Sequence, residues 1–249
     1  MAADTPSISL VTICRNAAPT IERTLLSVIE AAPPGTEYVV VDGGSTDGTV
    51  EILHRYRSCI SHLVSEPDRG ISDALNKGIA MTTGRYHLLV HADDVILPQA
   101  LDVLRAAAEF SGAQVVCGSA DVVRDAHVVR RFVAQPDRLT QKMSIPHMAA
   151  LVSKEAWQRV GGYDLRRRIA MDHLFMLKIL QAYGPAAFSV VDQVVARYSL
   201  GGVSDREVLQ GFREVRDNLV DAGFGRMHAL SAYAVLVMKS RLARLLRIG

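Results

Sequence analysis

The chain of 249 residues is 49% hydrophobic and 22% charged. This balance supplies enough apolar material for a packed core and excludes disorder over most of the chain. A formal net charge of +2 at pH 7 is too even to indicate nucleic acid as the main partner. The length suits one large α/β domain, or one domain with a C-terminal addition.

The three cysteines, Cys14, Cys59 and Cys117, lie far apart, and no C-x-x-C pair occurs. The sequence therefore indicates neither a disulfide framework nor a zinc site, and we expect a reducing cytoplasmic setting. We see no secretory leader, and no uncharged apolar run approaches the roughly 18 residues needed to cross a bilayer. The expected location is cytoplasmic, either free or peripheral on the inner face of the cell membrane.

The first half of the chain alternates short apolar runs with segments of helical periodicity. The predicted strands are residues 8–13, 38–41, 61–65 and 86–90, and the predicted helices are 20–31, 49–56, 72–80 and 98–110. This alternation is typical of an α/β fold with a mostly parallel sheet covered by helices on both faces. In such sheets, functional residues lie beyond the carboxyl ends of the strands, where Asn16, Asp42 and Asp93-Asp94 fall.

After Gly112 the alternation is less regular. The predicted strands are residues 115–119, 127–133, 148–152 and 190–198, and the predicted helices are 154–160, 170–182, 206–222 and 226–246. We find no internal repeat and no low-complexity linker. The sequence therefore predicts one globule over residues 1–204, followed by a C-terminal helical extension over residues 205–249.

Asp93-Asp94 is the strongest single chemical signal, because two adjacent carboxylates after a buried strand repel each other. Hard divalent cations take oxygen ligands and bridge to diphosphate oxygens. Such a cation would stabilise charge on a departing nucleoside diphosphate. The alternative is a solvated turn with an aspartate that caps the helix after Pro98.

The segment Asp42–Thr49, with the sequence DGGSTDGT, follows the second predicted strand. Its glycines allow a tight turn and a close approach of the backbone to a ligand. It matches neither G-x-G-x-x-G nor G-x-x-x-x-G-K-[ST], which disfavours a dinucleotide-binding fold and a P-loop. The alternative is a glycine-rich β–α turn without a ligand.

Taken together, these residues resemble the family 2 glycosyltransferases of the GT-A fold, within the subgroup of bacterial surface-polysaccharide and glycolipid biosynthesis. The matching stretches run in order from residue 8 to residue 204: Ile8–Asn16, Val39–Thr49, Glu66–Ile71, Ala74–Ile79, Thr83–Tyr86, Ala92–Asp94, Gly161–Asp164, Met171-Asp172 and Gly201–Ser204. Two departures are His91, where the family often has Asn or Asp, and Ser72, where the nearest subgroup frequently has an aromatic residue.

The resemblance implies a GT-A-like, Rossmann-type three-layer sandwich, with residues 8–112 binding the nucleotide and residues 113–204 binding the acceptor. It implies an inverting transfer from a nucleotide-diphosphate sugar, with a UDP-sugar favoured, to a saccharide or lipid-linked acceptor. Mn²⁺ or Mg²⁺ is the implied cofactor. Asp172 would be the catalytic base, Asp94 the metal ligand with Asp93 beside it, and the nucleotide contacts would be Thr12, Asn16, Asp42, Asp68, Arg69 and Asp93.

Several further residues keep two interpretations. His147 either contacts diphosphate, acceptor or metal, or is a hydrogen-bonded structural histidine. The run Arg166–Arg168 is either a solvated charge run or a contact for acceptor phosphates. In the last helix, Met238, Leu242, Leu245 and Leu246 share one arc, opposite Arg241, Arg244 and Arg247. That helix either lies on an anionic membrane, forms a homodimer interface, or packs on the domain with its arginines in water.

Two other functions use a similar set of residues. A sugar-phosphate nucleotidyltransferase would carry a basic, glycine-rich phosphate loop near the N-terminus, which Asn16–Pro19 does not supply. A noncatalytic nucleotide- or saccharide-binding protein in a membrane assembly would not need Asp93-Asp94 and Asp172. Donor hydrolysis that depends on Asp172 would exclude the binding protein.

Overall fold

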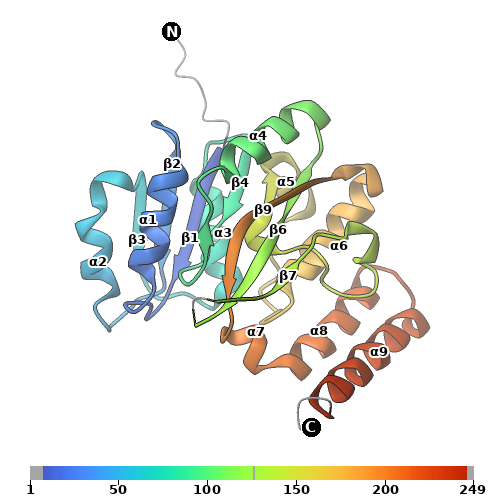
Figure 1. The fold of residues 1–249 in the computed structure, drawn as a ribbon. Coiled ribbons are helices and arrows are strands. Elements are labelled where there is room, and N and C mark those ends of the chain that lie inside the picture. The colour runs from blue at the N-terminus through green and yellow to red at the C-terminus, as the bar shows by residue number, and fades with distance from the viewer. Residues whose placement is uncertain (1–7, 126, 246–249) are drawn as a thin grey trace.

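The computed structural model describes residues 8–125 and 127–245, and their strands form one nine-stranded sheet with helices on both faces (Figure 1). The spatial order is β3-β2-β1-β4-β8-β6-β9-β5, and β7 pairs with β6 outside this path. The strands are β1 (Ile8–Cys14), β2 (Glu37–Asp42), β3 (His62–Ser65), β4 (Tyr86–Leu89), β5 (Val95–Ile96), β6 (Val115–Arg124), β7 (His127–Phe132), β8 (Ala150–Ser153) and β9 (Phe188–Ser199).

The helices form two layers, one on each face of the sheet. Helices α1, α2 and α4 cover one hydrophobic core, and α3, α5, α6, α8 and α9 cover the other. Their bounds are α1 (Ile21–Ala31), α2 (Thr49–Arg55), α3 (Ile71–Met81), α4 (Ala100–Ser111), α5 (Lys154–Val160), α6 (Met171–Tyr183), α7 (Val203–Arg206), α8 (Val208–Asp221) and α9 (Arg226–Leu245). The expected α/β fold with a mostly parallel sheet is confirmed.

The parallel half of the sheet, β3-β2-β1-β4, is built from the buried β-branched runs of the first 90 residues. Strand β8 then runs antiparallel between β4 and β6, so it begins at the end of the sheet where β4 finishes. Helix α3 crosses close to β1, because a Cβ atom on Gly78 would lie 2.5 Å from Cγ1 of Val11. This glycine therefore lets the helix approach the strand.

Three local predictions differ from the structure. The short strand β5 was not predicted, since two residues carry no readable periodicity. The strand predicted from Met148 begins later, because residues His147–Ala149 form a 3-10 turn after Pro146. The helix predicted over residues 206–222 is divided into α7 and α8 at Glu207, whose backbone (φ −108°, ψ 39°) leaves the helical region.

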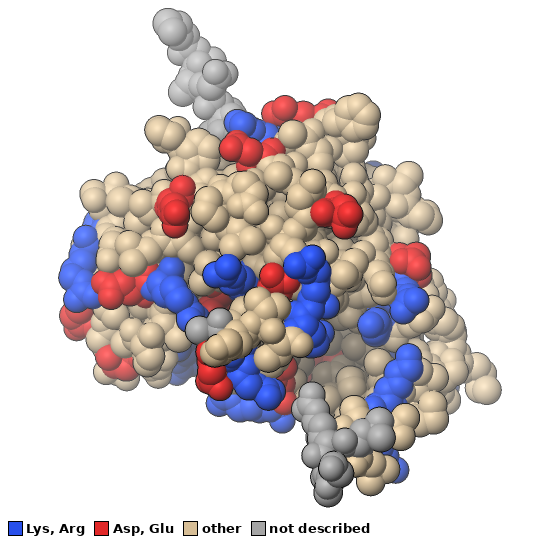
Figure 2. Space-filling model, viewed as in Figure 1, with Lys and Arg blue, Asp and Glu red and all other residues tan. Residues whose placement is uncertain are grey.

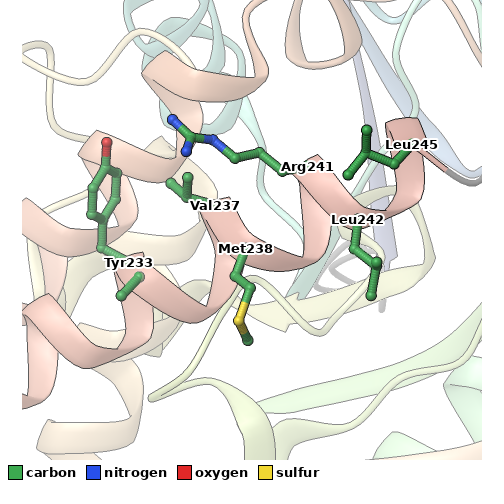
Figure 3. Close-up of a pocket in the computed structure, with 7 residues that line it drawn as sticks. Tyr233, Val237, Met238, Arg241, Leu242 and Leu245 are labelled. Atoms are coloured by element: carbon green, nitrogen blue, oxygen red, sulfur yellow. The ribbon is translucent and has the colours of Figure 1, made fainter.

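Acidic and basic side chains are interspersed over most of the face in Figure 2. None of the described helices is long and apolar enough to span a membrane. Helix α9 packs against α8 and contributes Ala229 and Ala232 to the core. Its outer side carries a groove of about 500 Å³, in which apolar side chains alternate with the stem of Arg241 (Figure 3).

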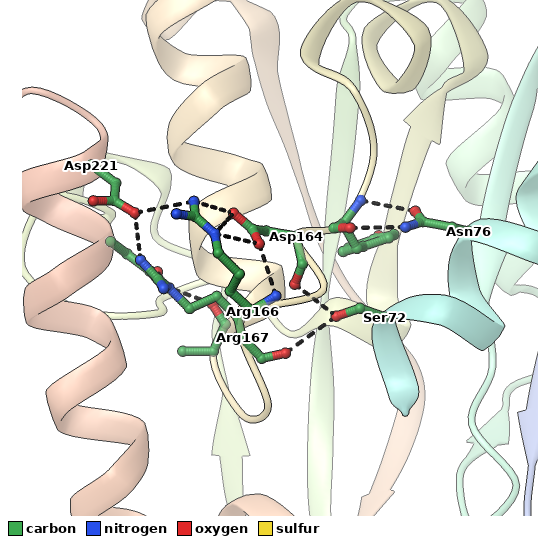
Figure 4. A network of polar contacts seen from close by, with 9 residues as sticks. Ser72, Asn76, Asp164, Arg166, Arg167 and Asp221 are labelled. Carbon is green, nitrogen blue, oxygen red and sulfur yellow. Dashed lines mark hydrogen bonds and ion pairs between the residues drawn. The ribbon is translucent and has the colours of Figure 1, made fainter. Parts of the chain in front are cut away.

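The loop between α5 and α6, residues 161–170, is tied to two helices that are distant in sequence (Figure 4). On the α3 side, Asn76 exchanges two hydrogen bonds with the backbone of Tyr163, at 2.8 and 2.9 Å, and the Ser72 hydroxyl donates to the Asp164 carbonyl at 3.1 Å. On the α8 side, the carboxylate of Glu214 accepts backbone N–H bonds from Arg168, Ile169 and Ala170 at 3.2, 2.9 and 2.8 Å.

The three arginines of this loop are also paired within the chain. Arg166 pairs with Asp164 at 2.7 Å, Arg167 with Asp221 at 2.6 Å and Arg168 with Glu207 at 2.6 Å. Together with Glu214, these pairs fasten the loop to the start of α8 and to its end. Arg167, with 11% of its side chain exposed, therefore acts as a structural clamp, whereas Arg166 and Arg168 are 71% exposed and match the solvated charge run. A contact of the run with acceptor phosphates stays a prediction.

Glu214→Ala should lower the free energy of unfolding by about 2–5 kcal/mol, because three backbone N–H groups of the loop lose their acceptor. Hydrogen exchange of the Arg168–Ala170 amides should quicken more than exchange in β1. Chemical denaturation and exchange mass spectrometry measure the two effects. Glu109→Ala, at an exposed position of α4, is the control and should change neither. Unchanged exchange of the loop amides in Glu214→Ala would contradict the anchoring role.

Candidate active site

The carboxyl ends of β1, β2 and β4 meet at one edge of the sheet, because these strands are parallel neighbours. The segments that leave these ends carry Asn16, Asp42 and the pair Asp93-Asp94. The antiparallel strand β8 begins at the same edge, so His147, just before it, also lies there. The structure thus brings together the polar residues that the sequence predicted for one edge.

Asp42 is fully buried, and its carboxylate organises the turn after β2. Its oxygens accept hydrogen bonds from the backbone N–H groups of Gly44 and Ser45 at 3.1 and 3.0 Å, and from the hydroxyl groups of Ser45 and Ser65. Burial alone would raise the pKa of Asp42, but these hydrogen bonds outweigh it and hold the pKa below its ordinary value. A nucleobase would have to replace one of these donors to bind the carboxylate.

The other two predicted residues near β1 differ in accessibility. Thr12 is buried, and its hydroxyl shares a 2.8 Å hydrogen bond with the hydroxyl of Tyr38. Asn16 is exposed in a left-handed conformation (φ 48°), where its side-chain oxygen accepts a hydrogen bond from Thr46 N–H at 2.9 Å. Asn16 therefore locks the β1–α1 and β2–α2 turns together at the surface of the site.

The loop after β3 carries Asp68 and Arg69. A Cβ atom on Gly43 would lie 2.1 Å from Oδ2 of Asp68, so the glycine makes room for that carboxylate over the β2 turn. Arg69 points away from Asp68 toward α3, where it pairs with Asp73 at 2.9 Å and remains largely exposed. The structure thus brings Asp68, but not the guanidinium of Arg69, against the Asp42 turn.

Asp94 is buried next to Asp93, and neither of its carboxylate oxygens has a hydrogen-bond partner among the described residues. Burial, with the charge of Asp93 added, raises the pKa of Asp94 well above its ordinary range. The backbone at this pair is held firmly, since Arg23 and the Ser199 hydroxyl donate to the Asp93 carbonyl at 2.9 and 2.7 Å. A buried, unpartnered carboxylate beside a second one fits a hard divalent cation.

The protein does not supply a complete metal cage by itself. Within residues 8–125 and 127–245, no three His, Cys, Asp or Glu side chains are grouped so that they could hold a metal ion. A cation on Asp94 and Asp93 would therefore need oxygen ligands from water or from a bound diphosphate. Cations shared in this way between one or two carboxylates and substrate phosphates are typical of Mg²⁺ sites.

A row of aromatic and imidazole rings leads from the Asp93-Asp94 loop to α6. His91 lies 5.7 Å from His147 between ring centroids, and Nε2 of His147 is 2.8 Å from the hydroxyl of Tyr163. The Tyr163 ring in turn packs 4.5 Å from Phe175 on α6. Burial, aided by the neighbouring His91 and His87, keeps the pKa of His147 well below its ordinary value, so its imidazole is neutral at pH 7. This row gives His147 a hydrogen-bonded position between the two candidate carboxylate sites.

Asp172 lies in the first turn of α6, at the far end of this row. Burial raises the pKa of Asp172 to about 6, although the His173 N–H donates to its carboxylate at 2.7 Å. Burial raises the pKa of Tyr163, and the charge of Asp172 raises it further. A carboxylate with a pKa near 6 is ionised at pH 7 and still able to accept a proton.

Sequence reasoning missed the residues that support Asp172. Glu214 and Asn218 lie more than 40 positions further along the chain, yet they bond the backbone on the N-terminal side of Asp172. Tyr163 lies in the family-like stretch Gly161–Asp164, but no role was predicted for it. The pattern of α8 is that of an ordinary amphipathic helix, so no local signal marked its polar side chains as partners of the loop.

Comparison with known proteins agrees with this geometry. Residues 9–175 match the family described as Glycosyl transferase family 2. A PGL/p-HBAD biosynthesis glycosyltransferase of Mycobacterium bovis is 29% identical over 216 residues, which cover 83% of this chain and 82% of that protein.

Two solved structures are similar in fold. S. aureus TarS 1-349 in complex with UDP-GlcNAc has a TM-score of 0.69 and 19% identity, over 93% of this chain and 71% of that one. Glucosyl-3-phosphoglycerate synthase of Mycobacterium tuberculosis, in complex with Mn²⁺, UDP and glucosyl-3-phosphoglycerate, has a TM-score of 0.64 and 18% identity, over 87% and 80%. The fold is therefore that of the GT-A glycosyltransferases, and the chain belongs to glycosyl transferase family 2.

Proposed function

We propose that this glycosyltransferase moves a sugar, with inversion, from a nucleotide-diphosphate donor to a hydroxyl group of a saccharide or lipid-linked acceptor in bacterial polysaccharide or glycolipid biosynthesis. A UDP-sugar is the favoured donor. The observation that carries the proposal is the row from His91 through His147 and Tyr163 to Asp172. It links the loop of Asp93 and the unpartnered Asp94 carboxylate, which suits a diphosphate-bound cation, with Asp172, whose pKa of about 6 suits a general base.

The similar proteins support the choice of donor and cofactor. The S. aureus structure contains UDP-GlcNAc, and the M. tuberculosis structure contains UDP with Mn²⁺. The M. bovis relative is described as acting in PGL/p-HBAD biosynthesis. In this chain, Mn²⁺ or Mg²⁺ held by Asp94 and Asp93 would supply electrostatic stabilisation of the departing nucleoside diphosphate.

Asp172 acts on the acceptor in this proposal. Its carboxylate takes the proton of the acceptor hydroxyl while the hydroxyl oxygen attacks the anomeric carbon. The bond from that carbon to the diphosphate breaks on the opposite side, so the configuration inverts and no covalent glycosyl-enzyme forms. The loop clamped by Glu214 holds the backbone next to Asp172 during this step.

The proposed nucleotide contacts in this region are still Thr12, Asn16, Asp42, Asp68 and Arg69. Asn16 and Arg69 are exposed, and Asp68 is half-buried against the Asp42 turn. The buried Thr12 and Asp42 would act mainly by shaping this turn, whereas Arg69 would need to leave Asp73 to reach a phosphate.

Asp94→Asn should stabilise the metal-free protein. Because folding raises the pKa of Asp94, its ionisation lowers the stability of the folded protein at pH values above the unfolded-state pKa of about 4. The amide of asparagine carries no charge and removes this cost. The Tm at pH 7 should rise by roughly 2–4 °C for each kcal/mol relieved, and Mn²⁺ should raise the Tm of the wild type only. The matched control is Asp102→Asn, at an exposed position of α4. A variant that is less stable than the wild type and still stabilised by Mn²⁺ would contradict the metal site.

The pH dependence of turnover tests Asp172. Because its pKa is about 6, kcat/KM should fall about tenfold for each pH unit below 6 and level off above pH 7. UDP release from UDP-sugars, with saccharide acceptors or with water, gives the rates. Asp172→Asn should lower turnover by about 10²–10⁴-fold and leave UDP affinity unchanged, while Asp192→Asn, exposed on β9, should match the wild type. Binding of UDP-sugars with no UDP release under any condition would favour the noncatalytic binding protein.

A further inference from the structure

The outward face of α9 exposes large apolar side chains along most of its described length, with Ser231 and Arg241 among them. Its inner face packs on the domain through Ala229, Ala232 and Leu236. The opposite side exposes residues that normally lie in a core, with exposed fractions of 80% for Met227, 61% for Met238 and 69% for Leu245, and with Leu230, Val235 and Leu242 between them. The stripe runs from Met227 to Leu245, a length of about 27 Å at 1.5 Å per residue. Large apolar side chains exposed in such a row mark an interaction surface.

Three interpretations of this helix were drawn from the sequence: a membrane contact, a homodimer interface, and packing on the domain with the arginines in water. In the structure, α9 packs on the domain and Arg241 is exposed, as the packing interpretation expects. Met238, Leu242 and Leu245 are nevertheless exposed near Arg241 (Figure 3), so packing leaves this apolar arc uncovered. Leu246 and Arg247 lie outside the described residues, as does the side chain of Arg244.

Basic side chains from three separate segments lie beside this stripe. Burial lowers the pKa of Lys142, and the charges of three nearby cations, Arg138, Lys239 of α9 and Arg130 of β7, lower it further. A hydrogen bond of 2.7 Å between Nε2 of His228 and the Thr140 carbonyl joins α9 to the loop that carries Lys142. No ion pair neutralises these four cations among the described residues, and no acidic residue follows Asp221 in the sequence. In Figure 2 the surface over α9 is accordingly tan and blue.

We propose that the stripe on α9 and the adjoining cations Arg130, Arg138, Lys142 and Lys239 form a docking surface for an anionic lipid bilayer. A helix that combines an outward apolar face with flanking cations lies in a membrane interface, where the lipid supplies both an apolar layer and negative charge. A homodimer with twofold symmetry would put this patch against itself, with cations facing cations and no acidic partner on α9. Charge complementarity therefore selects the bilayer.

Docking on this surface would bring the active site close to the membrane. Helix α8, on which α9 packs, also holds the loop before Asp172. In Figure 1, α8 and α9 lie at the end of the molecule toward which β1 and β9 point, which is the edge of the candidate active site. This inference rests on the proposed function and narrows its acceptor to one that is lipid-linked.

Flotation with vesicles tests the docking surface on the full chain. The wild type should bind vesicles of phosphatidylcholine with phosphatidylglycerol at least tenfold more tightly than vesicles of phosphatidylcholine alone, and added salt should weaken the binding. Lys142→Gln with Lys239→Gln should lower binding to anionic vesicles at least tenfold. Met238→Ser with Leu242→Ser should lower binding to both kinds of vesicle.

The matched control is Arg105→Gln with Phe110→Ser on α4, where Phe110 is 96% exposed and Arg105 is a surface cation. It should bind vesicles like the wild type. Absence of vesicle binding, or equal loss in the control, would overturn the proposal. A dimer in solution that Met238→Ser with Leu242→Ser disrupts would overturn it in favour of a second copy.

UDP titration with Mn²⁺ separates this inference from the proposed function. All the variants should retain UDP binding, since none changes a residue of the proposed metal or nucleotide site. Intact UDP binding without vesicle binding would reject the membrane surface but not the proposed function. Vesicle binding without UDP binding would leave the membrane surface standing and reject the proposed donor.

Discussion

The burial of the Asp94 carboxylate beside Asp93, without a hydrogen-bond donor among the described residues, is the constraint on which the site depends. The surrounding strands and helices hold this unfavourable arrangement in place, because Arg23, Thr24 and Ser199 bond the backbone carbonyls of the pair. The cost of the buried Asp94 carboxylate beside the half-buried Asp93 is relieved only by a proton or a cation. A site that must recruit positive charge for its own stability is well suited to bind an anionic diphosphate together with a metal ion.

Tertiary contacts join this edge of the sheet to the acceptor side. The row of His91, His147 and Tyr163 leads to Asp172, whose pKa is raised to about 6 by burial. The loop before Asp172 is clamped by α8, and α8 also supports α9 with its exposed apolar face. The C-terminal helices therefore support the candidate active site through this loop and also form the base of the proposed membrane surface.

Sequence patterns predicted the parallel half of the fold and the carboxylates well, because these features are local. Strands β1 and β2 are rich in β-branched residues, and β4 is a buried, mostly apolar run. Polar clusters follow all three, and Asp93-Asp94 is unusual chemistry on its own. The features that were missed depend on distant pairs, such as Glu214 with Ala170 and Tyr163 with His147. The helical wheel of α9 separated its two arcs but contained no information about which arc the domain covers.

In the proposed site, Asp94 and the donor diphosphate share one divalent cation. Calorimetric titration of UDP in Mn²⁺ and in chelator, on the wild type and on Asp94→Asn, tests this arrangement most directly. Mn²⁺ should tighten UDP binding at least tenfold in the wild type and have little effect in the variant, since coupled ligands strengthen each other reciprocally. Equal UDP affinity with Mn²⁺ and with chelator in the wild type would contradict it.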